Sequence, residues 1–271
     1  ANFGGSPRGN AVGFSIGLKG YIGSGYSGGP SVFYNDFWEY DPAINTWTQK
    51  ANISGGVREF AVGFSIANKG YVGLGWNGST EKNDFWEWDQ STDTWTQRAS
   101  FTSARFSSVG FSIGTKGYVG IGQNNTSATY NDFWEWDQST DTWSQKASFT
   151  GPTRSDGAGF AIGGKGYIGT GISSGPTYHQ DFCEYDPLTN GWTQKKNFPG
   201  GGRSFGVGFF IGNKGYMGTG KTNFSPFLFK DFWEYNPIAP SNDNSFSADS
   251  LAVNTSCIFK SSTSLGATQS S

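Results

Sequence analysis

The chain has 271 residues, of which 42 are glycine, and its 24 Phe, 12 Tyr and 11 Trp make up 17% of the sequence. Its 19 basic and 21 acidic side chains leave a formal net charge of −2 with no block of like charge, which disfavours nucleic acid and anionic membrane surfaces as partners. There is no sustained helical periodicity and no run of about 18 apolar residues, so the composition excludes a helical protein and a transmembrane helix and predicts a soluble all-β chain.

The first predicted strand covers residues 11–16, AVGFSI, in which Ala11, Gly13 and Ser15 alternate with larger apolar residues. Alternate residues of a strand point to opposite faces, so one face of this strand carries only small side chains. Glycine within a strand often marks a place where another backbone approaches closely. We therefore expect an innermost strand, at which neighbouring sheets converge.

Three more strands complete the predicted unit. The second begins with KGY at Lys19 and carries several glycines, and the third is DFWEY, which begins at Asp36. A turn rich in Asp, Pro and Asn leads into the fourth strand, TWTQK, at residues 46–50. The unit is predicted to be a four-stranded antiparallel sheet.

The same unit occurs five times along the chain. The KGY tripeptide recurs at steps of 47 to 50 residues and starts at Lys19, Lys69, Lys116, Lys165 and Lys214. The D-F-x-E motif starts at Asp36, Asp84, Asp132, Asp181 and Asp231. Periods of about 40 to 50 residues with strand-like motifs are typical of propeller blades. The repeats are assigned to residues 8–57, 58–104, 105–153, 154–202 and 203–237.

Each repeat has glycines on both sides of its second strand, and most have an aromatic residue before Asp or Asn at the end of the third strand and a tryptophan soon after it. This pattern resembles the kelch family of β-propellers, in the galactose oxidase-like superfamily, over residues 8–236. The family's second strand usually ends in a double glycine, whereas here it ends in G-x-G. The resemblance implies an all-β, five-bladed kelch-type β-propeller of four-stranded antiparallel blades, in a domain at residues 1–237.

Residues 1–7 match the loops that follow the fourth strands of later repeats, but no WTQ precedes them and none follows the fifth repeat. We therefore expect the N-terminal segment to close the fifth blade, incompletely, and to leave an unpaired edge there. Further upstream repeats are an alternative. The chain begins at Ala1 and its only methionine is Met217, so we expect any signal peptide to have been removed.

Residues 238–271 lack the repeat and are rich in Ser, Asn and Thr, which is typical of a linker or a disordered tail. Alternatively, FSADSLAV and CIFKSS are two strands of a truncated PKD or immunoglobulin-like β domain. This segment resembles the start of PKD-type domains of secreted bacterial proteins, although their WxFGDG signature is missing. Cys183 and Cys257 lie in unrelated contexts and predict neither a disulfide framework nor a thiolate metal site.

An arginine precedes every KGY by eleven residues, in the loop that leads into the innermost strand. Five guanidinium groups could thus surround one mouth of the central channel and bind a carboxylate or phosphate through bidentate hydrogen bonds. Alternatively, each arginine ties its own loop to carbonyls or to an acidic side chain. The residues are Arg8, Arg58, Arg105, Arg154 and Arg203.

The loop after the second strand varies most in length and sequence, and we expect it on the same face as the arginine loops. Binding residues favour such loops on a rigid scaffold. Aromatic residues among Asn, Ser and Thr suit sugar rings or a protein partner. Alternatively, some of them pack over the blade ends. The candidates are Tyr34, Trp76, Tyr130, Tyr178, His179 and Phe224.

Other repeated residues have structural interpretations. The glutamate of D-F-x-E should be partly buried and needs a cation, for which we expect Arg or Lys of the same or a neighbouring blade. The repeated tryptophans should fill the contacts between blades. Cys183 replaces one of them, which predicts a looser contact there.

The sequence has one histidine, His179. The copper-radical site of galactose oxidase needs two histidine ligands, so a single histidine excludes it. A zinc hydrolase site is excluded for the same reason, because the sequence has too few histidine ligands. We expect no cofactor and no metal site.

The favoured hypothesis is a non-catalytic, monomeric binding module of a secreted or cell-surface bacterial protein, without membrane insertion, that recognises a glycan or protein on the loop face. The alternative is a sugar-acid mutarotase, similar to the sialic-acid enzymes of the kelch type, that acts at the channel mouth.

Overall fold

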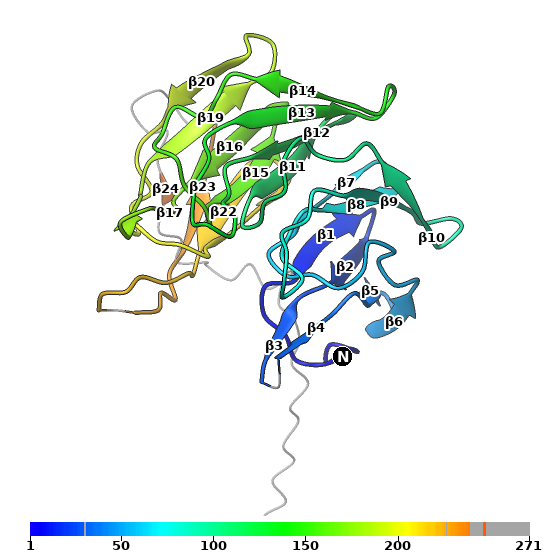
Figure 1. Ribbon diagram of the computed structural model, residues 1–271. Coiled ribbons are helices and arrows are strands. Elements are labelled where there is room, and N and C mark those ends of the chain that lie inside the picture. Colours follow the sequence, from blue (N-terminus) through cyan, green and yellow to red (C-terminus); the bar gives the residue numbers. More distant parts are fainter. Residues whose placement is uncertain (30, 226, 239–245, 248–271) are drawn as a thin grey trace, which may run out of the picture.

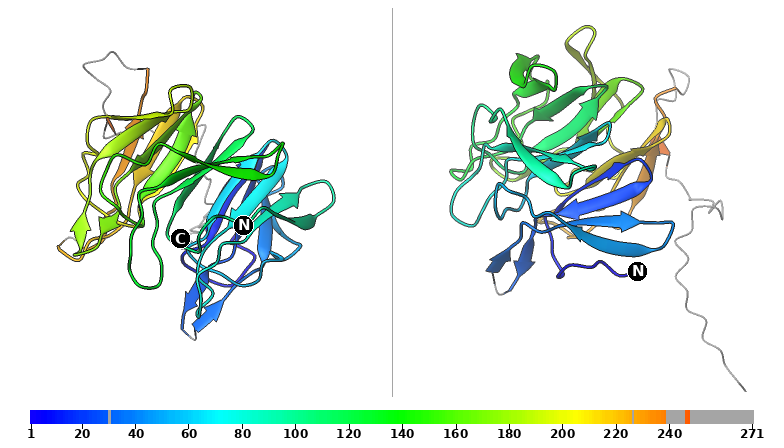
Figure 2. Two further views of the ribbon diagram at one scale, coloured as in Figure 1. Left: turned by 45° about the horizontal axis from the view of Figure 1, so that its top comes forward. Right: turned by 90° about the vertical axis from the view of Figure 1, so that its right-hand side faces the viewer.

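The computed structural model describes residues 1–29, 31–225, 227–238 and 246–247, and every regular element in this part of the chain is a β-strand. Five four-stranded antiparallel sheets follow one another in chain order around a central axis, from blue to orange in Figures 1 and 2. The fold is a five-bladed β-propeller, which confirms the predicted fold class. Among these residues no helix is long and apolar enough to cross a membrane.

The strands of each blade lie in chain order from the axis outwards. Blade 1 consists of β1 (Val12–Ile16), β2 (Lys19–Gly23), β5 (Phe37–Asp41) and β6 (Thr46–Lys50). Blade 2 consists of β7 (Val62–Ile66), β8 (Lys69–Gly73), β9 (Phe85–Asp89) and β10 (Thr94–Arg98). Blade 3 consists of β11 (Val109–Ile113), β12 (Lys116–Gly120), β13 (Phe133–Asp137) and β14 (Thr142–Lys146).

Blade 4 consists of β15 (Ala158–Ile162), β16 (Lys165–Gly169), β19 (Phe182–Asp186) and β20 (Gly191–Gln194). Blade 5 consists of β21 (Val207–Ile211), β22 (Lys214–Gly218), β23 (Phe232–Tyr235) and β24 (Phe246–Ser247). Two small hairpins rise from the loops after the second strands: β3 (Tyr26–Gly28) with β4 (Ser31–Phe33), and β17 (Ile172–Ser173) with β18 (Thr177–Tyr178).

The innermost strands of consecutive blades contact one another, as the alternation of small and large residues predicts. In β7 the large residues Val62, Phe64 and Ile66 are 3%, 4% and 3% exposed. Phe64 lies against Gly117 of the next blade, where a Cβ atom would come within 2.5 Å of the ring. Glycine is therefore required at Gly117 by the close approach of the neighbouring phenylalanine. In the described part of the chain, β21 and β1 make no corresponding contact.

Tryptophans fill the outer part of each interface. Trp88 of blade 2 is fully buried, and its ring lies 5.2 Å from Tyr21 and 5.0 Å from Phe37 of blade 1. Trp95 also packs edge-on against Phe37 and donates its indole N–H to the carbonyl of Ala51 at 2.8 Å. These contacts confirm the predicted packing role of the tryptophans.

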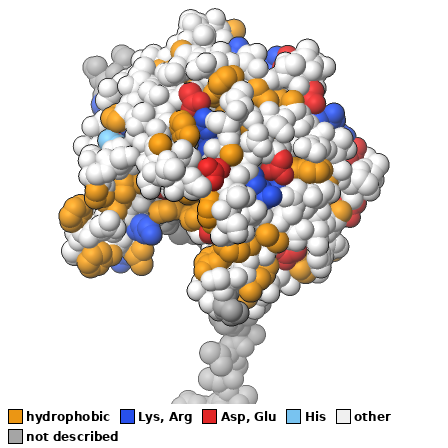
Figure 3. All heavy atoms as spheres, in the orientation of Figure 1, with side chains coloured by type: hydrophobic (Ala, Val, Ile, Leu, Met, Phe, Trp, Pro, Cys, Tyr) orange, Lys and Arg blue, Asp and Glu red, His pale blue; other side chains and the backbone are white. Residues whose placement is uncertain are grey.

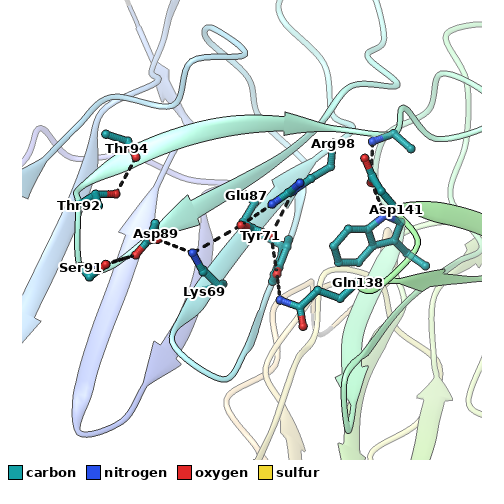
Figure 4. Close-up of polar contacts among 12 residues, drawn as sticks. Lys69, Tyr71, Glu87, Asp89, Ser91, Thr92, Thr94, Arg98, Gln138 and Asp141 are labelled. Carbon is teal, nitrogen blue, oxygen red and sulfur yellow. Dashed lines mark hydrogen bonds and ion pairs between the residues drawn. The ribbon is translucent and has the colours of Figure 1, made fainter.

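A charged network runs beneath these aromatic rings, drawn for blade 2 in Figure 4. Glu87 accepts hydrogen bonds from the hydroxyl of Tyr71 at 2.9 Å and from Arg98 at 2.8 Å, and Lys69 lies 3.7 Å away. Gln138 of blade 3 donates to the same Tyr71 hydroxyl at 2.7 Å and links the two blades. Burial and the bond to Glu87 raise the pKa of Tyr71. The expected cationic partners of the glutamates are thus confirmed, within the same blade.

The fourth strand of blade 5 differs from the prediction. It is β24, which pairs with β23, and not the N-terminal segment. Phe246 packs edge-on against Phe182 and Phe198, as Trp192 packs against the equivalent residues of the blade before. One aromatic residue therefore replaces the TWTQ motif, and the blade extends into the segment predicted as a linker. The rest of the two predicted tail strands lies outside the described residues.

Cys183, at a tryptophan position, is 2% exposed within the apolar cluster between blades 3 and 4. The hydroxyl of Thr150 lies 3.8 Å from its sulfur. Cys183 is thus shielded from solvent, and the expected looser packing stays a prediction. What the blade loses is an indole N–H, which in the other blades is donated to the aspartate two residues earlier.

The phenylalanine–glycine contact yields a matched pair of variants. Gly117→Ala forces a methyl group against the buried Phe64 and should lower the free energy of unfolding by about 1–3 kcal/mol. Gly20→Ala occupies the same position in blade 1, where the nearest atom is 3.9 Å away, and should change it by less than about 0.5 kcal/mol. Urea denaturation measures both, and equal losses would contradict the packing argument.

Candidate functional site

The loops before the inner strands and after the second strands meet on one face, as predicted. Each arginine loop forms a two-residue antiparallel bridge with the loop that follows the second strand of its own blade. The bridged pairs are Gly9 with Tyr26, Glu59 with Trp76, Phe106 with Gln123, Ser155 with Ile172, and Ser204 with Lys221. We call this surface the loop face.

The arginines lie beneath the loop face, and each forms an ion pair with an aspartate of its own blade. Arg58 is wholly buried and donates to both carboxylate oxygens of Asp84, at 2.9 and 2.8 Å, and to the carbonyl of Leu74 at 3.0 Å. The other side chains are at most 3% exposed. The ion pairs are Arg8 with Asp36, Arg58 with Asp84, Arg105 with Asp132, Arg154 with Asp181, and Arg203 with Asp231.

Aromatic rings cover the guanidinium planes. Tyr34 lies 4.1 Å from the guanidinium of Arg8, and Tyr130 lies 4.0 Å from that of Arg105. These two tyrosines of the predicted ligand set therefore bind the protein's own cations. No guanidinium surface is left for an anionic ligand, so the predicted anion-binding ring is corrected here: each arginine ties its loop to the blade.

Two of the paired aspartates, Asp84 and Asp132, are held in the charged form. Burial alone would raise the pKa of Asp84, but hydrogen bonds and the charge of Arg58 outweigh it and lower that pKa. The pKa of Asp132 is lowered for the same reasons, with Arg105 as the partner. The carboxylates are thus committed to the ion pairs at neutral pH.

The residue two positions after each arginine lies on an inner ring at the channel mouth. All five have left-handed backbone angles, with φ between 53° and 57°. Backbone hydrogen bonds of 3.0 to 3.1 Å link them from one blade to the next. In order around the axis they are Asn10, Phe60, Ser107, Asp156 and Phe205. This inner ring was not predicted from the sequence, in which the ring position and the residue before it both differ from blade to blade. The one regular signal is its fixed distance of two residues after the repeated arginine.

Aromatic side chains cover the mouth of the channel. The ring of Phe60, from blade 2, lies 5.7 Å from that of Phe205 in blade 5 and 6.1 Å from that of Phe106. Trp76, a predicted site residue, packs 5.8 Å from Phe106, and the amine of Lys221 lies 4.7 Å from the ring of Phe205. The mouth is therefore apolar at its centre, with a cation at one side.

Two carboxyl groups beside this aromatic cover have raised pKa values. Asp156 is 9% exposed and accepts a hydrogen bond from Ser155 at 2.7 Å, while its other oxygen has no partner among the described atoms. Burial raises its pKa and outweighs the opposing effect of the neighbouring Ser107 and Ser155 hydroxyl groups. Burial also raises the pKa of Glu59, against one hydrogen bond of 2.7 Å from Asn10.

Two adjoining grooves lie on the loop face. The first, of about 240 Å³, runs between the loops of blades 3 and 4. It is lined by hydroxyl and amide side chains, including Gln123 and Ser155, and by the apolar Ile172 and Pro176. The second, of about 500 Å³, lies between the loops of blades 4 and 5, where Tyr178 and Phe224 stand edge-to-face at 6.3 Å. Pro176 lines both grooves.

Three predicted site residues are gathered at these grooves. Tyr178 and Phe224 line the second, and Phe224 is 66% exposed. His179, beside Tyr178, has its Nε2 3.0 Å from the hydroxyl of Ser173 in the first groove, and burial lowers its pKa. Within the described residues, no group of three His, Cys, Asp or Glu side chains is arranged to hold a metal ion.

Comparisons with known proteins support the fold. No family model and no curated protein sequence matches the chain. The solved structure of YjhT superimposes with a TM-score of 0.77 at 16% sequence identity, over 92% of this chain and 86% of that one. At this identity the likeness shows the propeller fold alone.

The buried ion pairs predict a strong effect of one substitution. Asp84→Asn leaves Arg58 buried without its counter-charge and should lower the free energy of unfolding by about 3–5 kcal/mol at pH 7. Asp41→Asn, at a partly exposed pair with Lys19 at 3.4 Å, should cost at most about 1 kcal/mol.

The same pair predicts a pH dependence. The pKa of Asp84 is lower in the folded than in the unfolded chain, so its stabilising effect is present above about pH 4 and is lost as pH falls through the folded-state pKa. Unfolding curves between pH 2 and 7 should therefore have a shallower acid limb for Asp84→Asn than for the wild type. Identical limbs would contradict the assignment.

Proposed function

We propose that the protein is a kelch-type propeller that acts as a non-catalytic binding module and holds a carbohydrate in the two adjoining grooves of the loop face. The observation that carries this proposal is the edge-to-face pair Tyr178–Phe224 beside a groove lined by hydroxyl and amide groups. An apolar sugar face stacks on aromatic rings, while its hydroxyl groups need donors and acceptors at the rim.

The two grooves divide these tasks. In the second groove, Phe224 presents a largely exposed ring and Tyr178 braces it from the neighbouring blade. In the first groove, Gln123 and Ser155 are hydrogen-bonded to each other at 3.2 Å and present a polar edge. A ligand of two or more sugar units spans both grooves across Pro176, because the grooves share that residue.

The scaffold suits recognition without chemistry. The paired arginines fix the loops, and the residues that differ between blades lie on top of them. The resemblance of the C-terminal segment to the start of PKD-type domains of secreted bacterial proteins supports a secreted or cell-surface location.

Glycan-array screening followed by calorimetry tests the proposal. Tyr178→Ala and Phe224→Ser should each weaken binding of the selected oligosaccharide about 3- to 10-fold, through the loss of one stacking contact. Phe227→Ser is the matched control: this ring is 64% exposed on the same loop but does not line the groove, so affinity should be unchanged. An array without hits, or equal effects of all three variants, would count against the proposal.

The isomerase alternative has one observation in its favour. Glu59 and Asp156 at the channel mouth have raised pKa values, which is common for acid–base groups. The arginines that would hold a sugar acid's carboxylate are, however, buried in ion pairs.

Asp156→Asn separates the two functions. Since burial raises the pKa of Asp156, its charge weakens folding as pH rises above about 4, and the asparagine variant should be at least as stable as the wild type at pH 7. Anomeric exchange of sugar acids, followed by NMR, should be no faster with wild type than with Asp156→Asn. Accelerated exchange that this stable variant abolishes would establish the isomerase instead.

A further inference from the structure

The four contacts between consecutive blades follow one pattern. A phenylalanine of each inner strand lies over a glycine in the second strand of the next blade, where a Cβ atom would come within 2.3 to 2.5 Å of the ring. The pairs are Phe14 with Gly70, Phe64 with Gly117, Phe111 with Gly166, and Phe160 with Gly215. Each blade thus has one face that inserts a phenylalanine and one that receives it.

Within the described part of the chain, no other blade covers the inserting face of blade 5. Val207, Phe209 and Ile211 are 49%, 40% and 63% exposed, whereas their counterparts in β7 are at most 4% exposed. The ring of Phe209 stacks on Tyr216 of its own blade at 5.6 Å. An apolar face of this kind is unusual on the surface of a soluble protein.

The receiving face of blade 1 is also uncovered. Of the atoms that the structure describes, none from another blade lies within 4 Å of the Cβ positions of Gly13 and Gly20. Tyr40 is only half-buried, whereas Trp88 and Trp136, in the same position of blades 2 and 3, are fully buried.

These two faces stand opposite each other without touching. Within the described residues β21 and β1 make no contact, and the inter-blade hydrogen bonds of the inner ring run from Asn10 to Phe205 without a bond that joins these two residues. The first and last sheets are drawn in blue and orange in Figure 1, and Figure 3 shows a notch on the same side of the molecule, between the β3–β4 hairpin and the loop that follows β22.

The N-terminal segment lies where a preceding blade would place its tail. In blade 3, Asp141 accepts a hydrogen bond from the backbone N–H of Ala99, which belongs to the tail of blade 2. In blade 1, Asn45 accepts the equivalent bond from the amino group of Ala1. Phe3 packs on Trp38 and Trp47, as Phe101 of the blade 2 tail packs on Trp134 and Trp143.

We propose that a sixth blade of this repeat, whose fourth strand leads into Ala1, occupies the space between β21 and β1. The two uncovered faces are the two halves of the interface that already occurs four times in this structure, and they bind one blade between them. That blade must present small residues to Val207 and Phe209. On its other face it must present a phenylalanine that fills the space over Gly20.

A second copy of this chain fits less well. It would cover one of the two faces with its own opposite face and would leave the same pair of faces exposed at the ends of the resulting assembly. It would also not account for Ala1 and Phe3, which make with blade 1 the contacts that the tail of a preceding blade makes elsewhere.

A fusion built from the chain's own repeat tests the proposal. A second copy of residues 154–195, placed directly before Ala1, brings the tail Ala1–Phe3 into the register that Lys196–Phe198 has in blade 4. This fusion should remain monomeric, raise Tm by at least about 5 °C and slow amide exchange in β21 at least tenfold. The same fusion with Gly166→Val in the added copy should lose these gains, because its second strand can no longer receive Phe209.

A second measurement does not depend on the folding of the fusion. In the 271-residue chain, Phe209→Ser should change Tm by less than about 1 °C, whereas the matched Phe160→Ser, at a residue that is 3% exposed, should lower it by about 5 °C or more. Equal losses would show that blade 5 closes directly on blade 1. Concentration-dependent dimers in sedimentation, abolished by Phe209→Ser, would identify a second copy as the occupant, and either result would overturn the proposal.

Discussion

The buried pair of arginine and aspartate is the interaction on which the loop face depends. Arg58 joins three parts of its blade, because it lies in the loop before the inner strand and binds both the end of the second strand and Asp84 at the start of the third. Burying two charges costs nearly as much free energy as their pairing returns, so such a pair adds little net stability while its disruption is costly. Its contribution is therefore positional: repeated in every blade, it sets the loops at one height and in one direction around the axis.

A fixed support of this kind lets the adjacent residues differ from blade to blade. Phe60, Ser107 and Asp156 all have left-handed backbone angles, which cost a residue other than glycine about 1–3 kcal/mol unless its surroundings hold them. Here the hydrogen bonds between blades hold the backbone whatever the side chain. The position can therefore carry an aromatic ring, a hydroxyl or a carboxyl group without a change in the scaffold. The residues that hold the scaffold are therefore different from the residues that can contact a ligand. This explains why the fold does not by itself define a function.

The features that could be predicted from the sequence are those that depend on contacts between residues close together within one repeat. The strand order, the close packing at glycine and the cation beside Glu87 follow from residues at fixed register within one sheet. The partner of Arg58 could not be predicted in the same way, because Asp84 lies 26 residues away and only the course of two loops brings them together. The strand at Phe246 was missed because a single aromatic residue replaces a four-residue motif.

The sequence identified the loops that form the grooves but not which of their aromatic side chains face solvent. That depends on whether an arginine lies beneath the ring, as it does for Tyr34 and Tyr130.

The repeats also provide an internal comparison for the two carboxyl groups at the channel mouth. At the position of Asp156 the other blades have Asn, Phe, Ser and Phe, and at the position of Glu59 they have Gly, Phe, Ser and Ser. The fold therefore needs no acidic residue at either position. Burial nonetheless raises the pKa of both groups, so each weakens folding at neutral pH relative to an uncharged residue. Residues that lower stability where the scaffold accepts neutral ones are characteristic of functional sites. Glu59 adjoins Phe60 of the aromatic cover, and Asp156 adjoins Ser155, which lines the first groove. Asp156 therefore extends the candidate ligand surface from the grooves of blades 3 to 5 towards the axis.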